Sequence, residues 1–333
     1  MSWTSSQLRC FTGAFCLLLA ADQLASAQDV KKARLRLDFS AVGYHAPFFL
    51  GVEKGYYREK GIDLEVLEGK GSANSASLVG TGADTFAFAD ATTTARLVAQ
   101  GLPVKVVLGV FQKSTLALFF AASSPIQTPA NLKNKKISMC AADGMAQYVP
   151  IFLDATKVPV ADVQFVTVDC GAKYVVVAQG QADAVASYST AGKQLMNAVG
   201  IKDTRSFEYF DAGIVLPSHG IVASLKTISE DPKLIERFNA ATVKTWEAAK
   251  KDPDAAVAAL VAALPLQKGR ETVTRENLVN SFAYMATPGT AGKVFGWQSP
   301  DEWEQARAVL VKYLNVPNTL TPDRFYTNAF VAP

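Results

Sequence analysis

The sequence predicts an α/β protein built from two similar lobes. Residues 34–122 alternate apolar strand patterns with helical patterns, and residues 136–210 repeat that alternation after a turn-rich stretch. Beyond residue 224 the pattern is purely helical. Two sets of strands and helices with a crossover between them indicate two lobes that enclose a ligand cleft at a hinge.

The first unit, residues 34–66, predicts a strand, a loop, a helix and a second strand. Apolar residues recur at helical spacing after Pro47, which suits a first helical turn, and Gly61 suits the helix end. These apolar positions are Phe48, Phe49, Val52 and Tyr56. Residues 62–66 then alternate apolar and acidic side chains, as a half-buried strand does. Open α/β sheets bind ligands beyond the carboxyl ends of their strands, which makes the loop 40–46 a candidate ligand loop.

The remaining elements follow in the same order along the chain. Further strands are expected at 83–89, 104–110, 116–122, 136–140, 163–168, 181–189 and 205–210, with helices between most of them. Residues 211–224 are expected to return as extended chain towards the first lobe. Asp231-Pro232 and Asp252-Pro253 are expected to start helices, and two more helices at 274–286 and 299–315, the latter opened by Ser299-Pro300, come last. We therefore assign 28–122 and 213–333 to the first lobe and 123–212 to the second.

The composition excludes several classes of function. Of 333 residues, 49% are hydrophobic and 19% charged, and the net charge of +3 is spread along the chain, so no nucleic-acid-binding surface is implied. With two histidines and scattered cysteines, a structural zinc site is not supported. The glycines match neither a Walker loop nor a dinucleotide fingerprint, and we expect no cofactor.

Residues 1–27 are expected to be a secretory signal peptide. Arg9 supplies its positive region, residues 11–21 its apolar run, and 25–27 a small-x-small cleavage site. About ten apolar residues are too few for a membrane anchor, which needs roughly 20. The mature chain would then start at Gln28 and act outside the cytoplasm.

Two cysteines remain in the mature chain, Cys140 and Cys170, each at the end of a strand of the second lobe. If these strands are neighbours, their spacing of about 4.8 Å permits a disulfide. The alternative is two thiols that line a pocket wall.

The candidate ligand residues lie on loops after strands. In the first lobe they are Tyr44, His45, Ser72, Asn74, Asp90, Thr92 and Thr93; in the second they are Asp143, Gly144, Cys170 and Tyr188, with Asp211 on the return segment. Tyr44 and Tyr188 could stack on a planar ligand, and His45 could form a hydrogen bond to it. Ser72 or Asn74 could hold an anion or simply cap a helix, and Asp90 and Asp211 could accept from an amino group or cap neighbouring N–H groups.

Three stretches carry a resemblance to a known family. They are Tyr44-His45-Ala46-Pro47, GVEKGYYREKGIDLEV at 51–66, and SLVGTGADTFAFADATTTARLVAQGLPVKVV at 77–107. These stretches resemble the NMT1/THI5-like substrate-binding proteins of bacterial ABC importers, a group related to nitrate, sulfonate and taurine binders. The resemblance implies a type II periplasmic-binding fold, a small-molecule ligand between the lobes, and a monomeric periplasmic receptor that docks on an inner-membrane ABC permease. It also favours His45 as a ligand contact, since similar proteins often place a histidine there.

Several ligands and roles stay open. Tyr, His and Asp side chains favour a planar heteroaromatic such as a pyrimidine thiamin precursor, whereas Ser72, Thr92, Thr93 and Ser189 would suit an anion such as an alkanesulfonate, taurine, nitrate or an aromatic acid. A THI5-like enzyme that synthesises the thiamin pyrimidine is the alternative of another class. The CCCFC motif of those enzymes does not occur here, and we expect a protein that is not an enzyme. A sensor subunit that presents its ligand to a membrane receptor is also compatible with the sequence.

Overall fold

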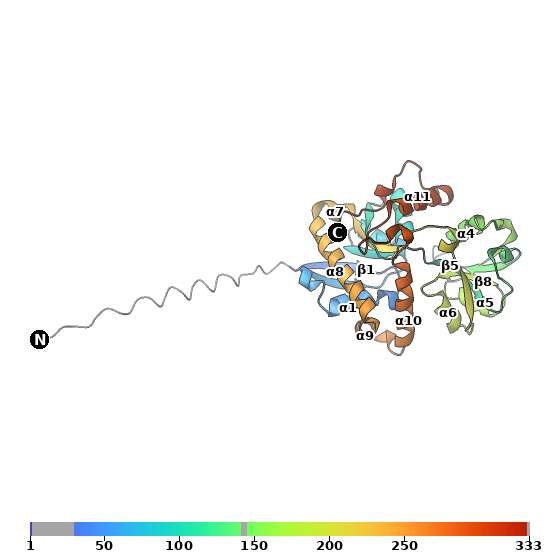
Figure 1. Ribbon diagram of the computed structural model, residues 1–333, viewed down its shortest axis with the longest axis horizontal. Coiled ribbons are helices and arrows are strands. Elements are labelled where there is room, and N and C mark those ends of the chain that lie inside the picture. The colour runs from blue at the N-terminus through green and yellow to red at the C-terminus, as the bar shows by residue number, and fades with distance from the viewer. Residues whose placement is uncertain (2–29, 141–144, 332–333) are drawn as a thin grey trace.

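The computed structural model describes Met1, residues 30–140 and residues 145–331. Residues 2–27 of the expected signal peptide, and the expected ligand residues Asp143 and Gly144, lie outside the described residues. Two five-stranded sheets lie side by side, each covered by helices, and we call each sheet with its helices a lobe (Figure 1).

The first sheet has the strand order β2-β1-β3-β10-β4. Its strands are β1 (Lys31–Arg36), β2 (Ile62–Leu67), β3 (Phe86–Asp90), β4 (Val104–Gly109) and β10 (His219–Ser224). β1 is parallel to β2 and β3, whereas β10 is antiparallel to β3 and β4. Its connecting helices are α1 (Ala46–Glu53), α2 (Ser72–Gly80) and α3 (Ala91–Ala99).

The second sheet has the order β7-β6-β8-β5-β9. Its strands are β5 (Leu116–Ala121), β6 (Lys136–Met139), β7 (Gln164–Thr167), β8 (Ala184–Tyr188) and β9 (Thr204–Glu208). Its helices are α4 (Val149–Ala155), α5 (Lys173–Ala178) and α6 (Gly192–Ala198). β6 is parallel to β7 and β8, and β5 is antiparallel to β8 and β9.

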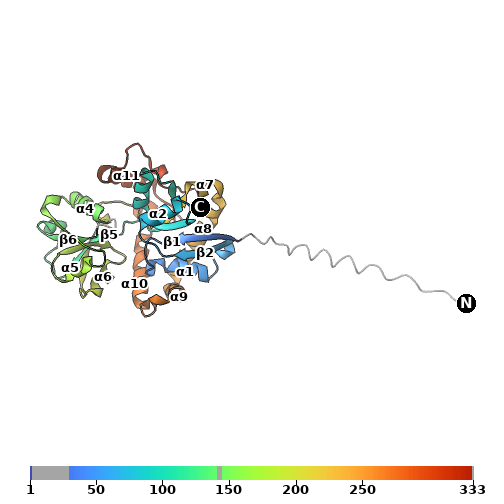
Figure 2. The same cartoon turned by 180° about the vertical axis from the view of Figure 1, so that it is seen from behind.

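The C-terminal part is helical and packs mainly on the first lobe (Figures 1 and 2). It comprises α7 (Leu225–Glu230), α8 (Pro232–Lys251), α9 (Pro253–Ala263), α10 (Glu271–Ser281) and α11 (Pro300–Leu314). α8, α9 and α11 each begin with a proline behind a capping side chain, supplied by Asp231, Asp252 and Ser299. These three starts confirm the prediction from the Asp-Pro and Ser-Pro pairs.

The pairing of one strand differs from the sequence expectation. Leu116–Ala121 was expected beside the strands of the first lobe, but β5 pairs only within the second sheet. The return segment joins the first lobe as expected, where β10 inserts antiparallel between β3 and β4, so the first sheet is mixed rather than wholly parallel. Local periodicity identifies a strand but carries no information about which distant strand will pair with it.

The helix expected from Pro47 to Lys60 is interrupted. α1 ends at Glu53, and Gly55 takes a left-handed φ of 72° before a short 3-10 turn leads to Gly61, whose φ is 67°. The extra turn carries Tyr57 into the core against Phe238, while Val52, expected on the buried face, is exposed.

The two lobes have separate hydrophobic cores. In the first lobe, Phe48, Phe88 and Phe111 pack with Trp246 of α8, which ties the C-terminal helices to the first sheet. In the second lobe, Phe120, Phe152 and Tyr209 belong to one buried cluster, in which the Phe152 and Tyr209 rings stack. Across the described residues, no helix combines the length and apolar character needed to cross a bilayer.

Candidate functional site

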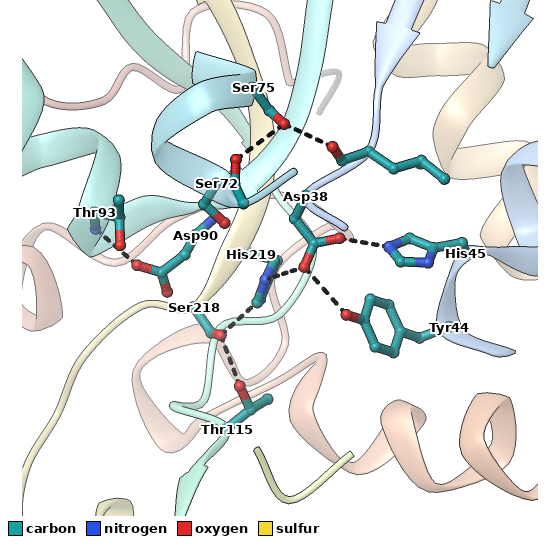
Figure 3. A network of polar contacts seen from close by, with 12 residues as sticks. Asp38, Tyr44, His45, Ser72, Ser75, Asp90, Thr93, Thr115, Ser218 and His219 are labelled. Atoms are coloured by element: carbon teal, nitrogen blue, oxygen red, sulfur yellow. Dashed lines mark hydrogen bonds and ion pairs between the residues drawn. The ribbon is translucent and has the colours of Figure 1, made fainter. Parts of the chain in front are cut away.

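A buried carboxylate, Asp38, lies two residues beyond the end of β1, at the edge of the first sheet that faces the second. Three donors converge on it (Figure 3). His45 Nε2 is 2.6 Å from Oδ1, while the Tyr44 hydroxyl and His219 Nε2 each lie 3.1 Å from Oδ2. Together these contacts hold the pKa of Asp38 well below its usual value: burial raises it, but the hydrogen bonds from the two histidines and the charge of His219 outweigh burial.

The two histidines make different second contacts. The backbone N–H of Val42 donates to His45 Nδ1 at 3.0 Å, so the ring hydrogen of His45 resides on Nε2 and points at Asp38. His219 Nδ1 instead lies 2.9 Å from the Ser218 hydroxyl, which is 3.1 Å from the Thr115 hydroxyl. A hydroxyl can either donate to or accept from Nδ1, so this arrangement accommodates both neutral and charged His219.

The pKa of His219 is shifted by its surroundings. Burial acts to lower its pKa, but the hydrogen bond and charge of Asp38, with a contribution from Asp90, raise the pKa of His219 above its usual value. Tyr44 behaves in the opposite sense: burial and the Asp38 charge raise its phenol pKa well above the usual value and keep the hydroxyl a donor.

Aromatic rings surround the cluster. Tyr44 is 5.8 Å from Phe111 and 6.3 Å from Phe88, and His219 is 6.1 Å from Tyr188 of the second sheet, measured between ring centroids. The Tyr188 contact brings the end of β8 against the end of β10. The site is therefore a carboxylate set among rings that both lobes supply, an arrangement suited to a flat molecule with a polar edge.

The start of α3 forms the adjoining wall. The Asp90 carboxylate caps this helix through a 2.7 Å contact with the Thr93 N–H, and its own N–H donates to the Ser72 hydroxyl (Figure 3). The Thr92 hydroxyl donates to Asp90 at 2.8 Å, so the Tyr148 hydroxyl of the second lobe, also 2.8 Å away, donates to Thr92. Burial and the Asp90 charge raise the pKa of the Tyr148 phenol.

The structure brings together most of the residues expected at the site. Those at the boundary between the lobes are Tyr44, His45, Ser72, Asp90, Thr92, Thr93 and Tyr188. Their contact with a ligand stays a prediction. Both ring nitrogens of His45 are already engaged within the protein, which limits it to contact through its ring or to a positioning role. Ser72 does not cap α2, whose N-cap is Gly71.

Three other expected residues lie apart from this group. Asn74 is exposed on α2, and Asp211 is exposed and 3.7 Å from Lys113. Cys170 forms a disulfide with Cys140, so the open choice between disulfide and free thiols is decided for the disulfide. The expected adjacency of their strands is also confirmed, because β6 and β7 pair in parallel.

Sequence reasoning missed Asp38, His219 and Tyr148 as members of the site, and Asn277, whose side-chain oxygen accepts from the backbone N–H of Tyr44 at 2.9 Å. Asp38 could have been found, since it follows an alternating strand directly and so lies at its carboxyl end. His219 was within the expected return segment, but nothing local indicated that it would pair with Asp38, 181 residues away in the chain.

Two cavities lie away from the cluster. One of about 890 Å³ is bounded by charged side chains at the opposite, amino ends of β1 and β2, and one of about 400 Å³ lies between Phe210, Trp297 and the start of α11. Within the described ranges, no three His, Cys, Asp or Glu side chains are arranged to hold a metal ion. We therefore centre the candidate site on Asp38.

Comparison with known proteins gives the family. A family model described as NMT1/THI5 like matches residues 42–256, more than half of the chain. The formylaminopyrimidine-binding protein of Halalkalibacterium halodurans is 24% identical over 309 residues, which cover 87% of this chain and 88% of that protein. The 4-amino-5-hydroxymethyl-2-methylpyrimidine phosphate synthase THI12 of Saccharomyces cerevisiae is 28% identical over 157 residues, 46% of this chain and 45% of that protein, so the chain spans less than half the length of this yeast relative.

The fold is also found among solved structures. The alkanesulfonate-binding protein SsuA from Xanthomonas axonopodis pv. citri, bound to MOPS, superposes with a TM-score of 0.67 at 12% identity and covers 89% of this chain and 98% of SsuA. This likeness shows the two-lobed periplasmic-binding fold that the sequence predicted. With the fold and the matched residues in agreement, the chain belongs to the NMT1/THI5-like family.

Proposed function

We propose that the chain is an extracytoplasmic solute-binding receptor that delivers a small planar heteroaromatic molecule, such as an aminopyrimidine precursor of thiamin, to an ABC importer. The observation that carries the proposal is the Asp38 cluster, in which a buried carboxylate lies among aromatic rings from both lobes. The named ligand of the Halalkalibacterium relative supports the same chemical class.

Electrostatics favour a neutral or amine-bearing ligand over an anion. Asp38 and Asp90 place two carboxylates at the lobe boundary, and the donors around them point toward these carboxylates rather than outward. A bound anion would meet this negative charge in a poorly solvated site, whereas an amino group could share it. The tyrosine rings offer stacking surfaces for the flat part of the ligand.

Export of the chain is part of the proposal. The Cys140–Cys170 disulfide is at home in an oxidising compartment such as the periplasm, which supports the expected signal peptide. Docking of the monomeric receptor on an inner-membrane permease would then complete the transport role.

An enzymatic role is the alternative that the yeast relative raises. The four cysteines of the chain, at positions 10, 16, 140 and 170, form no cluster like the CCCFC motif, and the latter two are joined to each other. An anion-binding role, for a sulfonate, taurine, nitrate or an aromatic acid, is the second alternative, and the experiment below includes all three classes.

The test is a ligand screen on residues 28–333 by thermal unfolding. A ligand present at 100 times its Kd stabilises the native state by about 2.7 kcal/mol. For about 300 residues that corresponds to a rise in Tm of about 4 °C. We expect this rise with 4-amino-5-hydroxymethyl-2-methylpyrimidine or its formylamino analogue, and none with taurine, nitrate or benzoate.

Two controls sharpen the screen. Tyr188→Leu should abolish the rise, whereas Tyr56→Leu, which alters another half-buried tyrosine in the first lobe, should leave it intact. Mass spectrometry of the recovered ligand should find it unchanged. A rise only with the anions would replace the heteroaromatic proposal, and chemical conversion of the ligand would overturn the receptor role.

A further inference from the structure

Asn277, a side chain of helix α10, joins the two lobes. This residue is buried, and its amide makes two hydrogen bonds to loops of different lobes. The backbone N–H of Tyr44 donates to its Oδ1 at 2.9 Å, and its Nδ2 donates to the backbone carbonyl of Thr190. Thr190 follows β8, whose last residue is Tyr188, so Asn277 links the turn that carries Tyr44 to the strand end that carries Tyr188.

The first-lobe end of this link is rigid. α10 packs so closely on the turn that a Cβ on Gly43 would lie 1.9 Å from the Thr274 carbonyl and 2.9 Å from Asn277 Cβ. Tyr44 is further fixed by its hydroxyl contact with Asp38. The backbone of the turn, α10 and the carboxylate cluster therefore pack as one unit, so a movement between the lobes would change the contact of Asn277 with Thr190.

An amide is the side chain that this position requires. One face must accept from an N–H and the other must donate to a carbonyl, and both partners are backbone groups that cannot change roles. A carboxylate of the same shape would keep the bond from Tyr44 and oppose the Thr190 carbonyl. The change Asn277→Asp would therefore remove this hydrogen bond between the lobes and leave the packing of the turn in place.

Other hydrogen bonds also cross the boundary. Among them, the Tyr148 hydroxyl donates to Thr92 at 2.8 Å, and the Tyr284 hydroxyl donates to Glu208 at 2.7 Å. The amide of Asn277 differs from these two in that it joins the turn that carries Tyr44 to the loop that follows Tyr188. Its bond to Thr190 thus reports directly on whether Tyr44 and Tyr188 are at the spacing seen here.

We propose that Asn277 is a positioning residue that couples closure of the two lobes to the spacing of Tyr44 and Tyr188, and thereby sets how long a ligand stays bound. The inference rests on the proposed function. In the open protein the bond to Thr190 is absent, and its formation on closure favours the ligand-retaining state. Loss of this bond lowers the population of the closed state and weakens apparent affinity in proportion.

The test compares Asn277→Asp with Asn280→Asp, the same change at an exposed position of the same helix. Small-angle X-ray scattering of the ligand-free proteins should give a larger radius of gyration for N277D than for the wild type and N280D. With 4-amino-5-hydroxymethyl-2-methylpyrimidine as probe, N277D should raise Kd about 10-fold, or about 1.4 kcal/mol, mainly through faster dissociation. N280D should stay within twofold of the wild type.

Asn277→Ser provides a second variant in case the buried carboxylate of N277D prevents folding. In N277S, water can satisfy the backbone N–H of Tyr44 and the backbone carbonyl of Thr190. It should show the same expansion and faster dissociation. Equal radii for the wild type and a folded Asn277 variant would overturn the inference, whatever the ligand. If the probe fails to bind the wild type, the pyrimidine proposal falls, and the scattering comparison still decides the role of Asn277.

Discussion

Replacement of Asp38 by asparagine tests the electrostatics of the cluster most directly. The side chain keeps its shape but loses its charge and one of its two acceptor oxygens, while Tyr44, His45 and His219 still point at it. At least one of the three charge-assisted hydrogen bonds is lost, because the new NH2 group cannot accept, and the others become weaker, at a cost of about 1 kcal/mol each. Part of this loss of stability is offset, because D38N no longer has to desolvate a buried charge when it folds. We expect D38N to lose about 2 kcal/mol at pH 7.5, or about 3 °C in Tm for about 300 residues.

The pH dependence of this loss follows from the two shifted groups. The pKa of His219 is raised above 6.5, so its pairing with Asp38 stabilises the fold fully below pH 6.5 and less as the pH rises through the folded value. The pKa of Asp38 is lowered from 3.8, so its contribution is present above that value and declines as the pH falls toward the folded value. The difference between wild type and D38N should therefore be largest between about pH 4 and pH 6.5.

The assay is guanidinium unfolding of both proteins from pH 3.5 to pH 9. Asp84→Asn is the matched control, because Asp84 is also buried but pairs with Arg36, which keeps its charge throughout this range. The cost of D84N should stay constant between pH 5 and pH 9, whereas that of D38N falls. A D38N cost that is flat with pH, or a D38N protein more stable than the wild type, would refute the assignment of His219 as the titrating partner.

Two further predictions concern the scaffold. The Cys140–Cys170 disulfide spans 30 residues of chain and should stabilise the fold by about 3.5 kcal/mol. A reductant should therefore lower the Tm of the wild type but not that of the Cys140→Ala/Cys170→Ala double variant. An equal response of the two proteins would argue against the bond. Gly51→Ala should lower the free energy of unfolding by about 1–3 kcal/mol, because its Cβ would lie 2.3 Å from Thr245 Oγ1 and 2.6 Å from Tyr57 Cε2. The control Gly171→Ala, with open space around it, should be close to neutral in chemical unfolding. Equal costs would contradict the packing described for α1.

Much of the fold could be predicted from the sequence because its signals are local. The period of two at residues 62–66 and the capping pairs at Asp231, Asp252 and Ser299 each act within a few residues, and these elements formed where expected. The repeated alternation of strands and helices predicted the two lobes, and the family resemblance implied the periplasmic-binding fold, which the superposition on SsuA confirms.

Only part of the candidate site could be predicted from such local signals. Tyr44, Asp90 and Tyr188 could be found because each lies next to the carboxyl end of a strand, and strand ends are recognisable one at a time. Asp38 meets His219 only because β10 runs antiparallel beside β3, and Asn277 meets Tyr44 only because α10 packs on Gly43.

The sequence by itself therefore determined the elements, their order and the family, since these depend on interactions between near neighbours along the chain. The tertiary structure decided the place of β5 in the second sheet, the insertion of β10 between β3 and β4, the partners of Asp38 and the link through Asn277. These contacts join residues separated by tens to hundreds of positions, and the free energy that selects them comes from packing of the whole molecule rather than from any local pattern.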